Sequence, residues 1–596
     1  MDGFNGTTFR FNLGSRRLGV GKTMSRGLLA LSFLSCAILS VLGREVIVQT
    51  SHGKVKGISD GLTVAFRGVP FASPPVGKLR WLPPQPPAPW AHVLAADVDP
   101  PGCPQIGCEK LTPTIACPKK MSEDCLYLNI FAPDGAGNTS GLPVMAYIHG
   151  GNFFDMSGSS PLFDGVYFTQ RGNVVQVNMN YRLGALGFLV TGDGDDDARG
   201  NYGLYDQVLA LKWIRDNIRQ FGGDPEKVTL FGQSAGAQSV IQHMTLDETA
   251  GLFQRAIIES SPLALPYKTY TEAFVLGGLL AEAVGCPVRD MDCLRAKTAE
   301  EITQASLKTR SEVASLKFLE MFEPYGPHID GRVVKGQPLD VYGAGGYQKK
   351  PIMIGSTREE TVLYIYGAYN KTVTVIDYLA LLLAVRPDKV IEMAEHYPPT
   401  SLEDQREVLV NISTDLVFGC PTRNLSRTLL DQGSGDVWLY LWDHAFSFPG
   451  WGQVTFCEGR VCHGTEIVYV FHTANKGNFT FTADEEALSS DLISYWTNFA
   501  WSGDPNTRDV TRQRPRQTDQ MAINAEATIH LGHQDMHARL DISSKVRGQL
   551  TPWPKYSPTS QWPAMHFLVP SRTLVHDYRD QFCQFWDGIG YGADRA

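Results

Sequence analysis

The sequence lacks an excess of positive charge. Its 596 residues carry 53 Lys and Arg against 62 Asp and Glu, which gives a formal net charge of −9 at pH 7. Nucleic-acid-binding proteins neutralise phosphates with clustered Lys and Arg, so this balance argues against a nucleic-acid partner. The chain also lacks an internal repeat and a clear linker, and we therefore expect one large domain.

Long apolar runs are scarce as well. One stands out, residues 28–42, and basic residues between positions 16 and 26 precede it while Gly43 ends it. The run is too short for a comfortable membrane span and is typical of a secretory signal peptide. We expect residues 1–43 to be an N-terminal extension and signal peptide, with Met24 as an alternative start and a signal anchor as the alternative interpretation.

The C-terminus has neither a retention tetrapeptide nor a hydrophobic anchor tail, which predicts a soluble, secreted, extracellular protein without a stable membrane span. Cysteine usage fits that compartment, because ten of the eleven cysteines lie outside the predicted signal peptide and can form five disulfides. Five glycosylation sequons are consistent with it; they stand at Asn138, Asn370, Asn411, Asn424 and Asn478.

Short β-branched and apolar runs alternate with longer helical patterns. Strands are predicted over residues 144–148, 174–179, 228–231, 256–259, 351–354 and 437–442, and helices over 204–218 and 485–501. This alternation predicts an α/β fold, in which a mostly parallel central sheet is flanked by helices on both faces. The polar, poorly periodic stretch 507–550 is expected to be an irregular insertion. The acidic run 193–197 lacks the Gly and Glu of a calcium loop, so we expect a surface loop and no metal site.

The motif G-Q-S-A-G at residues 232–236 follows a predicted strand and opens a predicted helix. A G-x-S-x-G in that context is a nucleophile elbow, a sharp turn that exposes its serine at the edge of a sheet. Ser234 is therefore the candidate nucleophile. The N–H groups at the start of the following helix face any negative charge that develops beside it.

A serine hydroxyl needs a base to take its proton and an acid to orient that base. Glu359 and Glu360 both lie just past the predicted strand 351–354, and His463 follows the predicted strand 437–442. Taken alone, a loop glutamate is usually solvated and a single histidine is usually structural. The chain order of serine, acid and histidine is nevertheless that of α/β-hydrolases.

Four further segments carry a family resemblance: F-R-G-V-P-F-A at 66–72, S-E-D-C-L-Y-L-N-I at 122–130, N-Y-R-L-G at 180–184 and F-G-G-D-P at 221–225. With the elbow, they resemble the type-B carboxylesterase and cholinesterase family over nearly all of residues 46–506, and again near 578–586. The resemblance implies a single large domain of the α/β-hydrolase fold over residues 44–596. It also implies a catalytic triad of Ser234, His463 and Glu360, rather than Glu359.

The resemblance further implies an oxyanion hole made of the backbone N–H groups of Gly151, Asn152 and Ala235. Family members commonly have a third glycine where this chain has Asn152. Its N–H remains available, but its side chain narrows the site, so we expect esters of tertiary alcohols to be poor substrates.

By resemblance, three disulfides are expected, Cys103–Cys125, Cys286–Cys293 and Cys420–Cys583. Four cysteines lack an obvious family counterpart, and proximity suggests the pairs Cys108–Cys117 and Cys457–Cys462. The last pair would hold the loop before His463, so its reduction is expected to lower activity.

Three positions argue against a true cholinesterase, which binds a cationic substrate on aromatic rings. The loop between Cys103 and Cys125 contains no Trp, Tyr or Phe, Leu363 stands where the family has a second aromatic residue, and Gln233 replaces a usual Glu. The site is thus expected to lack both an aromatic platform and a negative charge. Tyr364 and Tyr366 are candidates for a weaker aromatic wall, with ordinary packing as the alternative. The acyl pocket is expected to draw on Tyr267 and the stretch from Phe318 to Tyr325.

We therefore expect a secreted carboxylic ester hydrolase of broad specificity for small, uncharged esters, which acts through an acyl-enzyme and needs no cofactor. Close alternatives are a lipase-like enzyme and a choline-ester hydrolase. An alternative of a different class is a non-catalytic adhesion or binding protein of the same family. Such proteins have lost a triad residue, whereas all three are present here.

Overall fold

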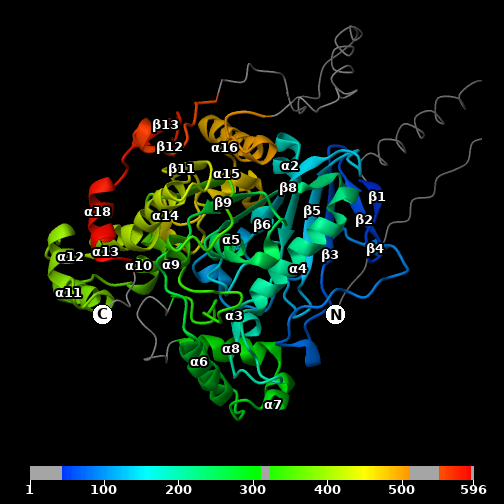
Figure 1. Ribbon diagram of the computed structural model, residues 1–596, viewed down its shortest axis with the longest axis horizontal. Helices are drawn as coiled ribbons and strands as arrows, with labels where there is room; N and C mark the ends of the chain where they lie inside the picture. Colours follow the sequence, from blue (N-terminus) through cyan, green and yellow to red (C-terminus); the bar gives the residue numbers. More distant parts are fainter. Residues whose placement is uncertain (1–42, 311–321, 509–549, 592–596) are drawn as a thin grey trace, which may run out of the picture. The chain divides into compact units, whose positions relative to one another are not determined.

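A thirteen-stranded sheet runs through the described part of the chain, which is residues 43–310, 322–508 and 550–591 of a computed structural model (Figure 1). In spatial order the strands are β1 (Arg44–Gln49), β2 (Lys54–Ser59), β3 (Thr63–Pro70), β5 (Tyr127–Pro133), β7 (Val175–Met179), β6 (Leu142–Ile148), β8 (Gly223–Gln233), β9 (Arg255–Glu259), β10 (Ile352–Thr357), β11 (Val437–Trp442), β12 (Pro563–Phe567) and β13 (Thr573–His576), with β4 (Leu94–Ala95) paired to β2. Neighbouring strands from β7 to β12 are parallel, and the pairs β2–β3, β3–β5, β5–β7 and β12–β13 are antiparallel.

The mostly parallel sheet predicted from the sequence is confirmed. The six predicted strands correspond to β6 through β11. The antiparallel strands at both edges were not predicted. The outermost of them, β1 and β13, are largely exposed and carry no continuous apolar run.

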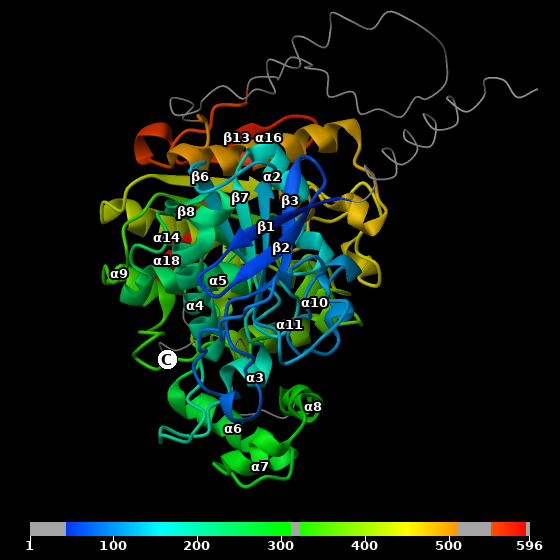
Figure 2. The same cartoon turned by 90° about the vertical axis from the view of Figure 1, so that its right-hand side faces the viewer.

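Helices cover both faces of the sheet, and the side chains of each strand alternate between them. On β6, Val144 and Ala146 join the core cluster of α4 (Tyr202–Asn217), α5 (Ala235–Thr245) and α14 (Cys420–Asp431). Met145 and Tyr147 join the opposite cluster, with α15 (Ile467–Phe471) and α16 (Ala483–Ser502). Figure 2 shows α4 and α5 on one side of the sheet, and α16 with α2 (Val166–Gly172) on the other.

The helix α16 illustrates how local sequence sets the helix ends. Thr482 and Glu485 form a capping box at its start, in which each side chain accepts a hydrogen bond from the other's backbone N–H. Gly503 ends the helix in the left-handed conformation at φ 84°. The predicted helices 485–501 and 204–218 correspond to α16 and α4.

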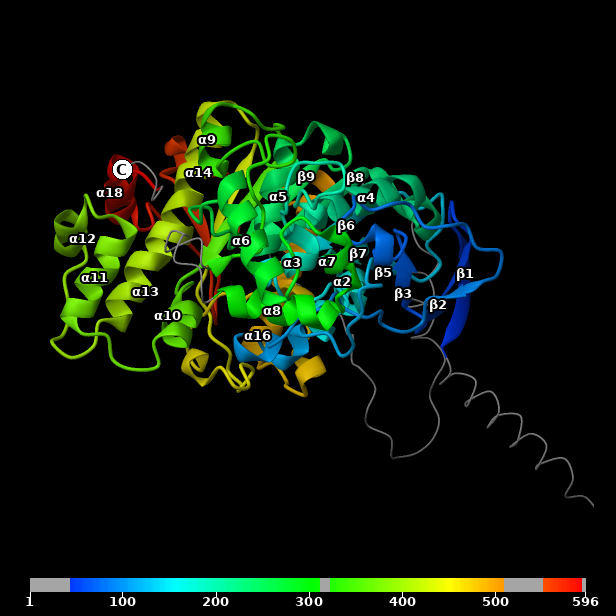
Figure 3. The same cartoon turned by 90° about the horizontal axis from the view of Figure 1, so that it is seen from below.

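A second group of helices packs beside the strand ends, and Figure 3 shows it gathered around α14. It consists of α10 (Val362–Ala368), α11 (Val375–Val385), α12 (Val390–His396), α13 (Arg406–Thr414), the π-helical turn η8 (Asp415–Gly419) and α18 (Asp580–Ile589). Its core includes Tyr378, Leu382, Leu409 and Trp586. The other α-helices are α3 (Gly184–Phe188), α6 (Tyr270–Ala283), α7 (Met291–Ala296), α8 (Ala299–Arg310) and α9 (Pro338–Gly343).

The structure contains five disulfides among its described residues: Cys103–Cys125, Cys108–Cys117, Cys286–Cys293, Cys420–Cys583 and Cys457–Cys462. Four of the sequon asparagines, Asn138, Asn370, Asn411 and Asn478, are exposed. The fifth, Asn424, donates its side-chain amide to Asp587 (3.1 Å), so its nitrogen already has a partner.

Two sequence predictions fall largely outside the described residues. The predicted signal peptide is one, apart from Gly43, and most of the stretch 507–550 is the other. The described ends of the latter meet, because Trp553 N donates to Asn506 Oδ1 (2.6 Å) and Asn506 Nδ2 donates to Trp553 O (2.8 Å). Among the helices that the structure describes, none combines the length and hydrophobicity needed to cross a bilayer.

Candidate active site

Ser234 lies at the turn between β8 and α5 in a strained conformation, at φ 59° and ψ −125°. Glycines make the turn possible: a Cβ on Gly236 would lie 2.0 Å from Ile148 O, and one on Gly232 would lie 2.6 Å from Gly236 O. Ser234 N donates to Glu259 O (2.9 Å), which ties the turn to the neighbouring strand β9. The serine side chain therefore lines a cavity at the edge of the sheet.

The structure brings His463 and Glu360 together. Glu360 follows β10 by three residues; its Oε1 accepts from Thr357 N (2.6 Å) and its Oε2 accepts from His463 Nδ1 (2.5 Å). Glu360 is fully buried and His463 is 7% exposed, so water does not compete for this bond. Glu359 points elsewhere, to Arg460 at 3.0 Å. Of the two candidate acids, Glu360 is thus the one that can orient the histidine.

The other ring nitrogen of His463 contacts Gln233. Because Nδ1 donates to Glu360, Nε2 carries the lone pair, and it accepts a hydrogen bond from Gln233 Nε2 at 3.0 Å. Ser234 and His463, both described, line the same cavity without a hydrogen bond between them. Gln233, the residue before Ser234, therefore occupies the second ring nitrogen of His463 in this structure.

The glycine-rich loop after β6 passes directly against the elbow. A Cβ on Gly150 would lie 2.8 Å from Gln233 O and 3.0 Å from Ser234 Cβ. Gly151, at φ 92°, has no room for a side chain either, because a Cβ would lie 2.3 Å from Asp155 O. The structure thus brings the predicted oxyanion residues Gly151 and Asn152 into the cavity wall beside Ser234.

The rest of the loop is held by buried contacts. Tyr181 donates its hydroxyl to His149 O (2.9 Å), and its ring stacks on the His149 ring with centroids 4.5 Å apart. Burial lowers the pKa of His149 to about 4, so this imidazole is neutral at physiological pH. Ala235 is the first residue of α5, where a backbone N–H has no partner within the helix.

Two further buried glutamates lie near the Glu360–His463 pair. Burial raises the pKa of Glu259 to about 8, although the hydrogen bond that Trp496 Nε1 donates to it (2.6 Å) acts in the opposite direction and lowers the pKa. Burial, followed by the like charges of Glu360 and Glu259, raises the pKa of Glu466 well above its usual value. With a pKa of about 8, Glu259 is mostly protonated at neutral pH, and burial shifts the pKa of Glu466 in the same direction.

The cavity itself is small, about 100 Å³, and Gln233, Leu363 and Tyr364 lie in its wall as predicted for the pocket. The expectation of a site without an aromatic platform or negative charge stays a prediction about substrate binding, but the cavity wall holds aromatic residues that the sequence did not point to. Three aromatic rings from the loop after β11 line the cavity, and so does one carboxylate; they are Phe446, Phe448, Trp451 and Asp155. The segment F-S-F-P-G-W at 446–451 was the sequence signal, but nothing in the chain order links it to Ser234.

Two predicted pocket residues are not in this wall. Tyr267 is 2% exposed and packs in the main core. Phe318 lies outside the described residues. Phe322, in the described part of the same stretch, lines a second cavity next to the first.

Taken together, the mostly parallel sheet, the nucleophile elbow and the acid and histidine after β10 and β11 define an α/β-hydrolase. The carboxylesterase family pattern matches residues 44–586. The chain therefore belongs to the carboxylesterase family, a family of carboxylic ester hydrolases.

Similar proteins agree with this assignment. The crystal protein of Dictyostelium discoideum is 36% identical over 77% of this chain and 82% of its own length. The acetylcholinesterase of Bungarus fasciatus is 34% identical over 80% of this chain and 82% of its own. The solved structure of a PNB esterase superimposes with a TM-score of 0.72 at 29% identity, over 90% of this chain and 99% of that one.

Proposed function

We propose that this protein hydrolyses uncharged esters, with broad specificity, by a catalytic triad of Ser234, His463 and Glu360. The observation that carries the proposal is the buried 2.5 Å hydrogen bond from His463 to Glu360, in the wall of the cavity that Ser234 lines. It supports the role of Glu360, because an acid on Nδ1 holds the tautomer whose Nε2 carries the lone pair needed by a base.

In the proposed mechanism, His463 Nε2 takes the hydroxyl proton of Ser234 as Ser234 Oγ attacks the ester carbonyl carbon. The tetrahedral intermediate collapses to an acyl-enzyme, and His463 gives the proton to the departing alcohol. Water then attacks the acyl carbon while His463 acts as the base again, and the acid product leaves Ser234 Oγ protonated. Because Gln233 occupies Nε2 in the resting site, its amide must move away before the first step.

The backbone N–H groups of Gly151, Asn152 and Ala235 are the proposed donors to the oxyanion. Each such donor contributes about 3 kcal/mol of transition-state stabilisation. The close passage of the loop against the elbow, at Gly150, supports this role. The Asn152 side chain in the cavity wall supports a preference for esters of primary and secondary alcohols.

We also propose that the protein is exported through the signal peptide predicted at residues 1–43. Five disulfides among the described residues support this, since such bonds persist in oxidising compartments. N-terminal sequencing of the protein collected from the culture medium would test it. A mature chain that begins near residue 44 is expected, and an intact N-terminus on a cell-associated chain would contradict it.

The experiment that tests the activity is turnover of p-nitrophenyl acetate, butyrate and octanoate, with acetylthiocholine alongside and Ser234→Ala as the control. We expect aryl-ester cleavage that Ser234→Ala abolishes, and slow choline-ester cleavage. The aromatic rings and Asp155 in the cavity make the choline ester a necessary comparison. A folded, disulfide-intact protein that cleaves none of these esters would instead favour the binding role.

A further inference from the structure

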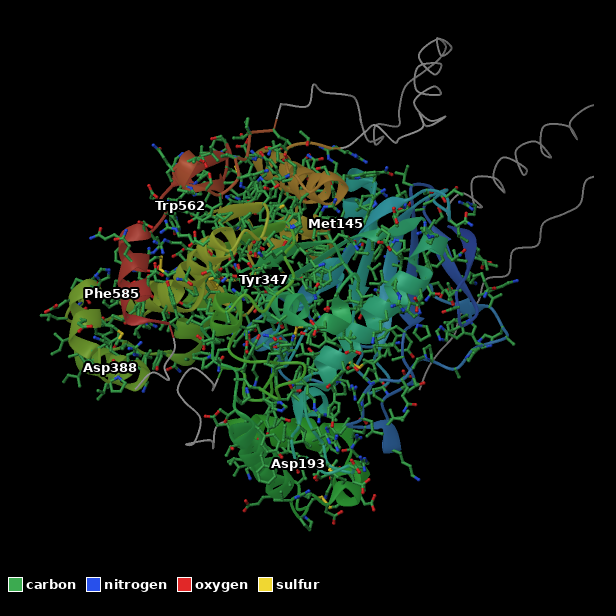
Figure 4. All side chains as sticks on the ribbon, viewed as in Figure 1. Met145, Asp193, Tyr347, Asp388, Trp562 and Phe585 are labelled. Carbon is green, nitrogen blue, oxygen red and sulfur yellow. A yellow bond between two sulfur atoms is a disulfide. The ribbon has the colours of Figure 1, made fainter. Side chains whose placement is uncertain are left out.

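A second cavity adjoins the catalytic one. It has a volume of about 490 Å³, against about 100 Å³ for the cavity that holds Ser234 and His463. Helices α10, α11 and α13 and the turn η8 form its walls. The label of Asp388 in Figure 4, in the loop between α11 and α12, marks this group of helices. We call the two spaces the catalytic chamber and the deep chamber.

The deep chamber is apolar. None of the described residues that line it is charged, and most are aliphatic or aromatic; they include Leu265, Leu382, Leu409, Ile412, Leu416 and Phe418. An apolar cavity of this size suits a hydrocarbon chain, because each methylene moved from water into such a wall strengthens binding by about fourfold. Its chemistry fits neither a charged group nor a metal ion.

Two residues belong to the walls of both chambers, Asn152 and Tyr364. Tyr364 Oη donates to Asn152 Oδ1 at 3.4 Å, so the two side chains meet across the boundary. Asn152 stands at φ 52°, a conformation that asparagine tolerates better than other side chains. A glycine here, as is common in the family, would leave the Tyr364 hydroxyl without this partner.

Tyr364 also faces the catalytic groups. Its ring centroid is 5.7 Å from that of His463 and 5.9 Å from that of Phe322. Tyr364 and Ser234 both line the catalytic chamber. The contact with Asn152 is longer than the roughly 2.5–3.0 Å of a strong O–H···O bond, and separating the two side chains therefore costs little. Rotation of Tyr364 would join the chambers.

We propose that Asn152 and Tyr364 form a partition between the chambers, and that an ester with a long acyl chain displaces it and places the end of the chain in the deep chamber. The pair is then the determinant of acyl-chain length. This proposal rests on the proposed ester hydrolysis, and it assigns to that site a class of substrate, esters of medium- and long-chain carboxylic acids.

The first test compares kcat/KM for p-nitrophenyl acetate, octanoate and laurate in four variants. Tyr364→Ala and Asn152→Gly remove the partition. Ala368→Trp places an indole in the deep chamber from its rim. Tyr366→Ala is the matched control, because Tyr366 is on the same helix but binds Glu407 outside both chambers.

If the proposal is right, Ala368→Trp lowers the ratio of laurate to acetate turnover at least tenfold and leaves acetate unchanged. Tyr364→Ala and Asn152→Gly raise that ratio severalfold, and Tyr366→Ala leaves it at the wild-type value. An unchanged ratio in Ala368→Trp, in a protein that melts at the wild-type temperature, overturns the proposal even though ester hydrolysis stands.

A second measurement does not depend on catalysis. Lauric acid is titrated into Ser234→Ala by calorimetry, with and without Ala368→Trp. Binding that Ala368→Trp weakens at least tenfold supports the deep chamber, whether or not the wild-type protein turns over any ester. Equal binding in the two proteins overturns it. Absence of turnover in the first test, by contrast, counts against the proposed function.

Discussion

The side-chain amide of Gln233 donates to Nε2 of His463 across 3.0 Å, on the ring nitrogen opposite the one that Glu360 binds. Gln233 thus presents a neutral amide to this nitrogen, where a Glu at the same position would present a carboxylate. Gln233, which precedes Ser234 in the chain, is therefore in direct contact with the proposed base.

We expect Gln233→Glu to move the acid limb of the pH profile of kcat/KM upward by roughly one pH unit, because a carboxylate stabilises the protonated, inactive histidine. Gln233→Ala removes the donor without adding charge, and is expected to shift the limb less. The profile is recorded on p-nitrophenyl butyrate from pH 4 to 9. Coinciding acid limbs in Gln233→Glu and wild type would show that residue 233 does not act on the base.

The adjacent glutamates provide a matched pair. Glu360→Gln is expected to lower kcat about ten-thousand-fold, because an amide can leave the histidine in the wrong tautomer. Glu359→Gln is expected to retain activity within a few fold, since Glu359 binds Arg460 in the next loop. Equal losses in the two variants would mean that the assignment of the acid is wrong.

The disulfide Cys457–Cys462 ends one residue before His463, so it bears on the position of the base. Replacing both cysteines by Ser should lower kcat/KM roughly tenfold to a hundredfold, because small misplacements of a catalytic group are costly. The pair Cys286–Cys293 is the control: its loop is of similar length, and it lies at α7, away from the cavity.

Both double variants are expected to lose similar amounts of stability, since loops of similar length constrain the unfolded chain similarly. Melting temperature and kcat/KM are measured on the same preparations. If the two variants lose activity in step with stability, the bond near His463 has no specific role in catalysis.

Acid stability is expected to depend on Glu485. Burial alone would raise its pKa, but hydrogen bonds from the Ser447 hydroxyl, Thr482 N, His444 and the Tyr469 hydroxyl outweigh it and lower the pKa to about 2. Because the folded pKa is below the usual 4.5, Glu485 contributes stability above pH 4.5 that is lost as the pH falls toward 2.

The measurement is the free energy of unfolding in urea between pH 6 and 3. Glu485→Gln should be less stable at pH 6 and should approach the wild type as the pH falls. Asp484→Asn changes an exposed carboxylate in the same helix turn and should leave the wild-type slope intact. A constant difference between Glu485→Gln and wild type at every pH would contradict the assignment.

Local pattern alone determined the strands and helices that form the centre of this protein. The apolar runs at 144–148 and 437–442 predict strands, and the helical spacing of apolar residues at 204–218 predicts a helix. The structure contains all three elements. The motif at 232–236 determined the elbow in the same way, because only glycine fits the close approach at Gly236. These strands, helices and the elbow depend on residues only a few positions apart in the chain, so they can be predicted from the local sequence.

The tertiary structure decided what meets in the cavity. It separated Glu360 from Glu359, put Tyr267 in the core and brought Trp451 from a distant loop into the wall of the cavity that Ser234 lines. It also joined Gln233 to His463 across 230 positions of the chain. Such contacts depend on how loops converge above the ends of parallel strands, and that convergence is set by the packing of the whole sheet and not by the order of residues within any one loop.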